Sequence, residues 1–422
     1  MDILKVFSGN LVKYRKQINL SQAKFAEKVG LHRTYISAVE CGKRSIALEN
    51  IQKISEALQI EPYKLFIDET NPIEYAAIDL FCGIGGLTHG LKMAGINVVA
   101  GVDINHACKY AYEKNNDAIF INKSILDISS DELLNLYPKN AIKILVGCAP
   151  CQPFSKYTQR YRKDGHKDDK WKLLYYFGEL IEKVLPEIVS MENVPELIHE
   201  EVFNDFTSKL KKIGYYVSSS IAYCPDYGVP QSRKRLVLLA SRLSDIKLIE
   251  PLYKKENYRT VRDVIGGLPP IADGECNDKD IMHQASKLSQ INKERIKQSV
   301  EGGSWRDWDE KLQLSCHKKT TGKSYPSVYG RMCWDAPSPT ITTQFYGYGN
   351  GRFGHPEQNR ALSLREGALL QSFPLNYEFI EDGKQFNKKE LGIHIGNAVP
   401  VQLGRAIGIS IKEHFQGGNK DE

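Results

Sequence analysis

Residues 75–95 read YAAIDLFCGIGGLTHGLKMAG, and this segment gives the clearest indication of the fold class. Its first part is a short apolar run that predicts a buried strand, and its last part has the apolar spacing of a helix. Glycines at 83, 85 and 86 lie between them, so the backbone can turn tightly and approach a ligand at the helix N-terminus. Thr88 stands where the last glycine of a G-x-G-x-x-G fingerprint would be, so this is not the usual dinucleotide motif.

Strand and helix patterns alternate along most of the chain after this unit. Further β-rich runs read NVVAGVDI, AIFIN, ILVGCAP, EIVSMENV and RLVLLAS. The alternation predicts an α/β fold with a Rossmann-like, doubly wound, mostly parallel sheet. Between residues 242 and 328 the pattern gives way to polar sequence punctuated by glycine and proline, which indicates a smaller module. LSLREGALLQSF and VPVQLGRAIGISI then predict two amphipathic helices of the α/β domain.

Two acidic residues follow predicted strands at one edge of this sheet. Asp103 ends the second strand, about 20 residues after the glycines, where an acid can bind ribose hydroxyls. Asp127 follows the third strand. With the glycine turn they favour an adenosine-type ligand, although an ordinary tight turn with two capping acids would have the same residues.

The N-terminal residues 1–70 have a different pattern, with four short amphipathic helices. Ser21 suits an N-cap and Gly30 a tight turn between helices. This order resembles the helix-turn-helix domain of phage repressors of the Cro type, with SQAKFAEKVG and HRTYISAVE as the two helices of the motif. The resemblance implies a recognition helix whose major-groove contacts are His32, Arg33, Thr34, Tyr35 and Ser37, with Gln22 on a phosphate. The alternative is a module for dimerisation or for non-specific DNA affinity.

The segment GCAPCQPFS, residues 147–155, has two cysteines in a C-x-x-C pattern. We expect Cys148 to lie on the strand and to pack, because a thioredoxin-type pair would have both cysteines at a helix start. Cys151 lies beyond the strand, where open α/β sheets bind ligands, and two prolines fix its direction. A buried, inert thiol is the alternative for Cys151.

Three later motifs supply polar groups. MENV ends the fifth predicted strand with Glu192, a carboxyl that a partly apolar pocket would keep protonated. QSRKR has Gln231, Arg233 and Arg235 at alternate positions of an extended segment, so all three point one way. GNAVP has Asn397 in a turn before a helix.

Taken in order, DLFCGIGGL, GCAPCQPFS, MENV, QSRKR and IGNAVP resemble the motifs of the DNA (cytosine-5) methyltransferases, and the match runs from residue 75 to about 410. The resemblance implies that Cys151 adds to carbon 6 of a flipped-out cytosine. Glu192 would bind the N3 edge of the base, and Arg235, with Arg233 nearby, would steady Glu192. Gln231 is expected at the DNA. The cofactor would be S-adenosyl-L-methionine, leaving S-adenosyl-L-homocysteine, and the residues implied at its pocket are Phe81, Gly83, Gly85, Leu87, Asp103, Ile104, Asp127, Ile128, Leu173 and Asn397.

Three positions depart from the family pattern. A small residue is usual where Cys82 stands, a second proline where Ala149 stands, and often Glu where Asp103 stands. The basic segment after Cys151, SKYTQRYRKDGHKDDKWK, falls where the family has a mobile catalytic loop. The resemblance divides the chain into a helix-turn-helix domain (1–70), a catalytic domain (75–241 and 329–415) and a target-recognition region (242–328). The candidate DNA contacts in that region are Arg259, Arg262, Trp305, Arg306, Lys318, Lys319 and Tyr325.

The overall composition sets further limits. A net charge of +6 in 422 residues fits a polyanionic partner, here double-stranded DNA as substrate and as the operator of the protein's own gene. The nine cysteines are scattered without paired spacing, and no signal-peptide layout or apolar membrane span is evident, which predicts a cytoplasmic protein. No second Cys/His pair has the spacing of zinc ligands, so no metal is expected. We expect a monomer for catalysis and a dimer through the N-terminal domain. The alternative functions are tRNA methylation, which one branch of the family performs, and a non-catalytic transcriptional regulator.

Overall fold

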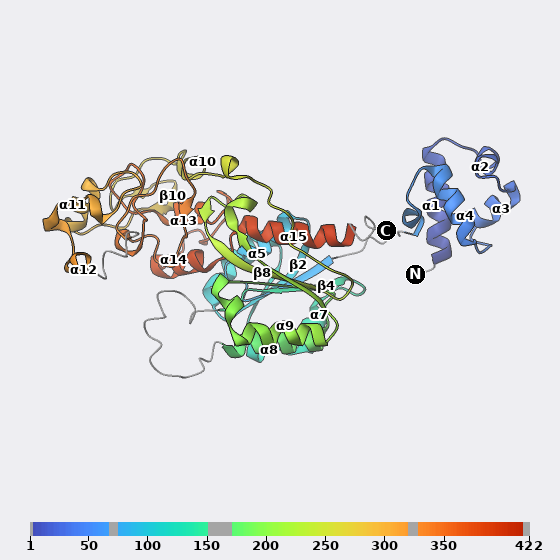
Figure 1. Cartoon of the computed structure of the whole chain (residues 1–422), viewed down its shortest axis with the longest axis horizontal. Coiled ribbons are helices and arrows are strands. Elements are labelled where there is room, and N and C mark those ends of the chain that lie inside the picture. The colour runs from blue at the N-terminus through green and yellow to red at the C-terminus, as the bar shows by residue number, and fades with distance from the viewer. Residues whose placement is uncertain (1–2, 67–74, 151–170, 320–327, 417–422) are drawn as a thin grey trace. The chain divides into compact units, whose positions relative to one another are not determined.

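The structure, a computed structural model, describes residues 3–66, 75–150, 171–319 and 328–416 (Figure 1). Contacts divide the chain into two compact units, Met1–Glu74 and Tyr75–Glu422. Cys151 and most of the basic segment that follows it lie outside the described residues. No helix among the described residues is long and apolar enough to span a membrane.

The first unit is a bundle of short helices. Its elements are α1 (Ile3–Gln17), α2 (Gln22–Val29), α3 (Arg33–Glu40), α4 (Leu48–Leu58) and a 3-10 turn η1 (Pro62–Phe66). Apolar residues at helical spacing meet in one core, in which Leu11, Phe25 and Ile36 are fully buried. The predicted cap is confirmed, because the Ser21 side chain accepts a hydrogen bond from the Lys24 N–H at 3.3 Å. Gly30 ends α2 with φ 72°, in the left-handed region that favours glycine.

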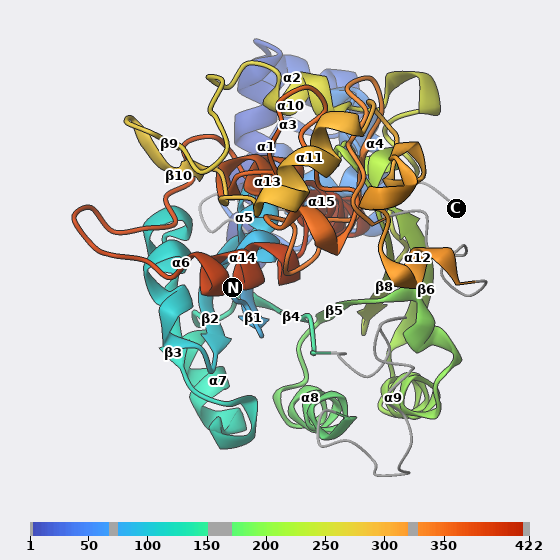
Figure 2. The same ribbon diagram turned by 90° about the vertical axis from the view of Figure 1, so that its left-hand side faces the viewer.

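The second unit is built on a seven-stranded sheet in the order β3-β2-β1-β4-β5-β8-β6 (Figure 2). Its strands are β1 (Tyr75–Leu80), β2 (Asn97–Asp103), β3 (Ile119–Asn122), β4 (Ile142–Gly147), β5 (Ile188–Asn193), β6 (Tyr216–Tyr223) and β8 (Lys234–Ser241). The first five pair in parallel, and β8 runs antiparallel to both its neighbours. The predicted mostly parallel α/β fold is therefore confirmed.

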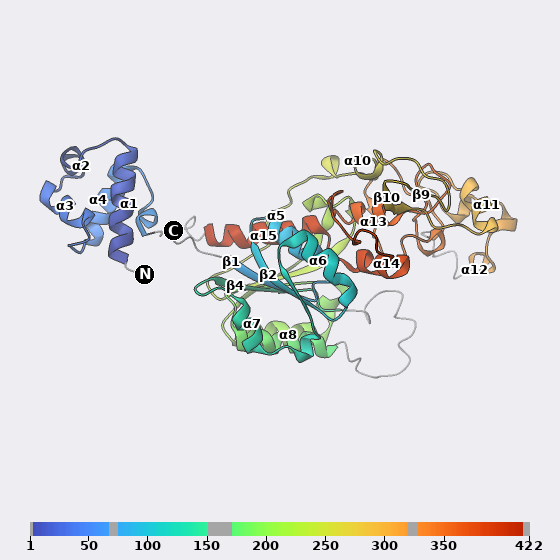
Figure 3. The same cartoon turned by 180° about the vertical axis from the view of Figure 1, so that it is seen from behind.

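Helices cover both faces of this sheet, which explains why its central strands β1, β4 and β5 are mostly buried (Figures 1 and 3). One face carries α5 (Gly86–Met93), α6 (Lys109–Asn116) and α15 (Val401–Gln416), and the other α7 (Ser130–Leu136), α8 (Trp171–Val184) and α9 (Glu201–Lys212). The first and last helices of this unit, α5 and α15, touch through glycines. A methyl group on Gly90 would lie 2.3 Å from the Val401 carbonyl oxygen and 2.5 Å from the Arg405 nitrogen. The C-terminal helix thus closes the core that the first strand–helix unit begins.

Short elements make up the rest of this unit. They are η2 (His106–Cys108), η3 (Ile125–Asp127), η6 (Pro195–His199), η7 (Cys224–Tyr227), β7 (Gln231–Ser232), η8 (Lys255–Asn257), α10 (Val261–Ile265), β9 (Cys276–Asn277), β10 (Asp280–Gln284), α11 (Gln290–Gln298), η9 (Trp305–Asp307), η10 (Glu310–Leu312), α12 (Ser315–Lys318), β11 (Ser338–Pro339), η12 (Tyr348–Asn350), α13 (Leu364–Leu370) and α14 (Lys388–Asn397). The segment around residues 288–361 has a small core of its own, which includes Ile296, Trp305, Trp308 and Tyr348. Trp305 stacks on His317 in this core and is 5% exposed, so its expected availability to DNA is wrong. Tyr325 lies outside the described residues.

Candidate active site

The candidate site lies where β4 and β5 end. These strands are parallel and in register, with Gly147 opposite Met191, so the next pair along the edge is Cys148 and Glu192. Parallel strands have their carboxyl ends at the same edge, which is where open α/β sheets bind ligands. Cys151 follows three residues after Cys148. The chain therefore leaves β4 directly beside Glu192.

Glu192 is a buried carboxylate held from two sides. Its side chain is 3% exposed, and its Oε1 lies 2.8 Å from the Arg235 Nε in an ion pair. Its Oε2 accepts a hydrogen bond from the Cys148 Sγ at 2.8 Å. A carboxyl group buried this deeply needs polar partners, and Arg235 and Cys148 supply them.

Cys148 differs from the sequence-based expectation. It lies one residue beyond β4 and its N–H reaches the Leu80 carbonyl at 3.3 Å. The thiol does not only pack, since it is hydrogen-bonded to Glu192. Burial raises the pKa of Cys148 well above its usual value, and the neighbouring Glu192 adds to the shift. The sulfur therefore stays protonated and acts as a donor.

Gln231 and Arg233 lie behind this pair. Gln231 is fully buried, donates to the Leu370 carbonyl at 3.2 Å, and accepts from the Ile341 N–H at 2.9 Å. Its expected position at the DNA is therefore wrong, because it has no exposed surface and fixes the chain segments around it. Arg233 is 4% exposed, and its Nη1 donates to the Ile341 carbonyl at 3.1 Å. Burial lowers the pKa of Arg233 to about 9, and the positive charge of Arg235 contributes.

The residues expected at the cofactor pocket begin with Asp103. Its two carboxylate oxygens accept the backbone N–H groups of Gly83, at 2.9 Å, and of Asn105, at 2.8 Å. These two hydrogen bonds hold the glycine turn in place. In this turn Phe81 and Gly85 have positive φ angles of 62° and 84°. Each oxygen keeps a lone pair for a ligand hydroxyl.

Other expected pocket residues are distributed along the same edge. Ile104 is 73% exposed and Asp127 is exposed in η3, whereas Leu173 is half-buried on α8. Asn397 is the exposed last residue of α14, and the Asn105 side chain contacts His394 of that helix at 2.8 Å, so α14 ends near Asp103. Leu87 and Ile128 are each 3% exposed and belong to the two cores. Their side chains therefore do not line a pocket in this structure, and only their backbone could.

In the N-terminal unit, the residues expected to contact DNA lie on or near α3. Arg33 and Thr34 are exposed at its first turn, after the N-cap His32, and Ser37 is half-buried. The Tyr35 hydroxyl accepts from the Asn50 Nδ2 at 3.1 Å. The Gln22 Nε2 donates to the Glu40 Oε2 at 2.7 Å, and Glu40 also pairs with Arg15, so Gln22 is already engaged by the protein.

Comparisons with known proteins agree with this geometry. The model of the C-5 cytosine-specific DNA methylase family matches residues 75–413, and a helix-turn-helix model matches residues 11–65. The chain belongs to the C-5 cytosine-specific DNA methylases. The methylase is 56% identical over 345 residues to the Type II methylase M.HgiDII of Herpetosiphon aurantiacus, covering 81% of this chain and 96% of that protein.

Two other relatives extend the comparison. The Type II methyltransferase M.Sau96I of Staphylococcus aureus is 27% identical and is matched over 99% of this methylase and 100% of its own length. A prophage-encoded candidate DNA modification methyltransferase from E. coli has the same fold, with a TM-score of 0.62 at 20% identity over 81% of this chain and 100% of the other. The predicted family, enzyme class and N-terminal helix-turn-helix domain are thus confirmed. The tRNA and non-catalytic alternatives have no support in the family match.

The methyl donor of this family is S-adenosylmethionine, and the edge at Asp103 has suitable chemistry for it. An adenosyl group offers ribose hydroxyls and a flat, apolar base. Asp103 offers acceptors, and Ile104 beside it is an uncovered apolar side chain. Leu126, which no sequence motif indicates, is also apolar and is 45% exposed. No group of side chains that could hold a metal ion occurs among the described residues.

Proposed function

We propose that this methylase modifies carbon 5 of a cytosine flipped out of a specific duplex sequence, through a covalent bond between Cys151 and carbon 6. Carbon 5 is a poor nucleophile until a thiolate has added to the neighbouring carbon. The cytosine must leave the stack to meet the thiolate, which costs a few kcal/mol of unstacking. The loss of the carbon 5 proton after methylation would then reverse the addition and free Cys151.

The observation that carries this proposal is the buried Glu192 beside the exit of β4. Glu192 would contact the N3 edge of the base and stabilise its protonated form while Cys151 adds. Arg235, 2.8 Å from Glu192, would hold the carboxyl group and approach the O2 of the base. Arg233 would support both from behind, since its side chain is buried against the loop at Ile341. A thiolate alone would add slowly without this polarisation of the ring.

S-adenosylmethionine supplies the methyl group, and residues of the Asp103 edge would hold it. Asp103 would accept from the ribose hydroxyls, Ile104 would contact the adenine, and the backbone around Phe81 to Leu87 would lie against the methionine part. Asp127 would bind the adenine edge together with the backbone of Ile128. Leu173 and Asn397 would complete the walls.

Base-resolution methylation sequencing tests the reaction. DNA from cells that express the chain would be compared with DNA from cells that express Cys151→Ser. The expected result is 5-methylcytosine at one recurrent motif, absent with Cys151→Ser. Full methylation by Cys151→Ser would contradict the proposed nucleophile. An unmethylated genome in cells with folded enzyme would contradict the DNA substrate and direct the same assay to RNA.

We also propose that the helix-turn-helix unit binds an operator of the methylase's own gene as a dimer, within a restriction-modification or phage system. The exposed Arg33 and Thr34 at the start of α3 support base contacts, with Tyr35, Ser37 and Gln22 beside them. Helix-turn-helix proteins read palindromes as symmetric dimers, which requires a second copy. The catalytic unit would act as a monomer, in the cytoplasm, where its DNA lies.

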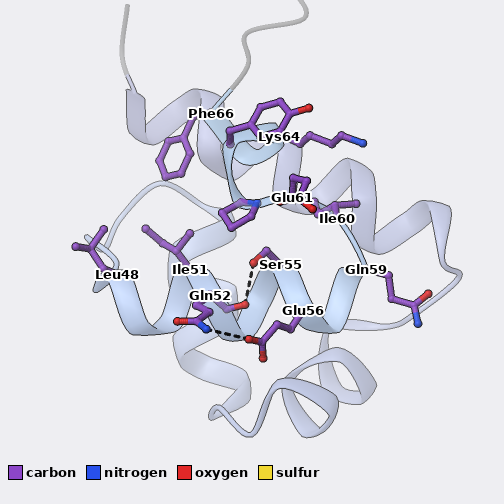
Figure 4. Close-up of a pocket in the computed structure, with 12 residues that line it drawn as sticks. Leu48, Ile51, Gln52, Ser55, Glu56, Gln59, Ile60, Glu61, Lys64 and Phe66 are labelled. Atoms are coloured by element: carbon purple, nitrogen blue, oxygen red, sulfur yellow. Dashed lines mark hydrogen bonds between the residues drawn. The ribbon is translucent and has the colours of Figure 1, made fainter. Parts of the chain in front are cut away.

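An apolar groove on this unit would suit that second copy. A pocket of about 730 Å³ lies between α4 and η1, and Figure 4 shows the residues that line it. Its apolar lining includes Leu48, which is 83% exposed, and Tyr63, which is 42% exposed. Such uncovered apolar surface favours association.

Sedimentation of the full chain tests this dimer. Leu48→Asp should shift a dimer to monomer, whereas Leu243→Asp, at an exposed leucine of the other unit, should leave it unchanged. A monomeric wild-type chain, both free and on a palindromic operator, would contradict the dimer. Lack of binding to DNA upstream of the gene in a mobility-shift assay would contradict self-repression.

A further inference from the structure

The position of Cys148 follows from strand register. Residues opposite each other in neighbouring strands project to the same side of the sheet. Because Gly147 pairs with Met191, the side chains at 148 and 192 are neighbours at the sheet edge. Whatever stands at position 148 must therefore meet the acid. In this chain it is a thiol.

The carboxylate of Glu192 has one contact on each oxygen. Arg235 approaches Oε1 from β8, and Cys148 donates to Oε2 from the end of β4. No further hydrogen bond to this carboxylate is found within residues 75–150, 171–319 and 328–416. The two partners come from either side of β5, one from β8 and one from the end of β4. Two such contacts fix the plane of the carboxylate, whereas a single contact would leave it free to rotate.

The chemistry of Cys148 suits a donor and not a second nucleophile. Burial and the charge of Glu192 raise the pKa of the thiol, so the proton stays on sulfur. The S–H group is a weak donor, but its acceptor here is a buried carboxylate, which strengthens the bond.

We propose that Cys148 is a positioning residue for the methylation reaction, in which its S–H holds Oε2 of Glu192 and, together with Arg235, sets the carboxyl plane that meets the base. The inference rests on the proposed function, which assigns Glu192 to the N3 edge of cytosine. It gives the two cysteines of the C-x-x-C segment separate tasks: Cys151 bonds to carbon 6, and Cys148 orients the acid.

Single-turnover methylation tests the inference. The substrate is unmethylated genomic DNA with tritium-labelled S-adenosylmethionine at saturation. Cys148→Ala should lower the single-turnover rate roughly 3- to 10-fold, the range expected for one hydrogen bond. Steady-state turnover at varied concentrations should give an unchanged KM for DNA and for the methyl donor. Cys148→Ser keeps a donor and should recover most of the rate. Cys276→Ala removes a half-buried cysteine of the residues 242–328 region and should be neutral.

Other results would overturn the role of Cys148. These are a wild-type rate in Cys148→Ala, an equal loss in Cys148→Ser and Cys148→Ala, or a change in KM alone. Cys151→Ser in the same assay separates the two proposals. Activity lost there but kept in Cys148→Ala contradicts only the positioning role, whereas activity kept in Cys151→Ser contradicts the proposed reaction as well.

Infrared spectroscopy gives a readout independent of turnover. The difference spectrum between the wild-type chain and Cys148→Ala should contain an S–H stretching band broadened and lowered by a strong acceptor. In the Glu192→Gln background the band should move toward the position of a weakly bonded thiol. A free-thiol band in the wild-type difference spectrum would overturn the contact.

Discussion

The close contact between α5 and α15 predicts both the sign and the size of the change in the free energy of unfolding when Gly90 is replaced by alanine. Gly90→Ala would place a methyl group 2.3 Å from the Val401 carbonyl oxygen and 2.6 Å from the Gly404 carbonyl carbon. These are backbone atoms of a helix, so they cannot rotate away, and the two helices must separate. Overpacking of this kind costs roughly 3 kcal/mol, and alanine in a helix returns about 1 kcal/mol. The net expectation is a loss of about 2 kcal/mol.

Gly178→Ala in α8 is the matched control. Its methyl group would have its nearest neighbour, the Phe206 ring, at 3.4 Å, which is ordinary contact. Only the helix propensity then changes, and the expected effect is a gain of up to about 1 kcal/mol. The same chemical change should therefore have opposite signs in two helices of one unit.

Urea unfolding followed by tryptophan fluorescence measures both variants. All four tryptophans lie between residues 171 and 334, so the signal reports the methyltransferase unit and not the helix-turn-helix unit. With a slope of about 3 kcal/mol per molar urea, the midpoint of Gly90→Ala should fall by roughly 0.7 M. A midpoint for Gly90→Ala equal to or above that of Gly178→Ala would refute the close approach of α5 and α15.

Three further predictions concern buried polar groups and a helix cap. Burial raises the pKa of Asp79 to about 7, so the stability that Asp79 contributes is present below about pH 4 and is lost as the pH rises to 7. Over that range the free energy of unfolding of Asp79→Asn should rise by up to about 4 kcal/mol relative to the wild-type chain. A pH-independent difference in urea unfolding would contradict this. Arg360 donates to both carboxylate oxygens of Glu366 at 2.6 and 2.8 Å, so Arg360→Met would leave Glu366 buried without its cation. The free energy of unfolding, measured by fluorescence, should fall by about 3–5 kcal/mol. Adding Glu366→Gln in a double variant should restore part of this loss. Ser21→Ala should cost the helix-turn-helix unit about 1 kcal/mol in circular dichroism while the tryptophan transition stays unchanged.

The sheet could be predicted because its central strands are short apolar runs at the right intervals. The sequence pattern does not predict strand β6, YVSSSIAY, because it lies at the edge of the sheet and most of its residues are exposed or half-buried. An edge strand with one neighbour needs few apolar residues, so its sequence resembles a loop. The antiparallel direction of β8 also depends on where the chain returns, which composition does not reveal.

The site was predictable in its residue types and only partly in its contacts. Alternation in QSRKR correctly indicates that Gln231 and Arg233 share a side, but the loops that bury them, at residues 338–341 and 370–371, are more than a hundred residues away. The role of Cys148 depends on the register between β4 and β5, which no local pattern encodes. Local sequence therefore gives a side chain's direction, and tertiary packing decides what it meets.

Helix α15 completes the core of the methyltransferase unit late in synthesis. The core of the helix-turn-helix unit is complete with Leu65, whereas the methyltransferase core awaits Leu403, Ile407 and Ile411 of α15. At ribosomal rates of about 5–20 residues per second, roughly 20 to 70 seconds separate the two events on each chain. A nascent chain can thus display a folded helix-turn-helix unit well before its own methyltransferase unit is complete. Under the proposed function, fresh translation gives a cell the capacity to occupy an operator first and the capacity to modify DNA afterwards.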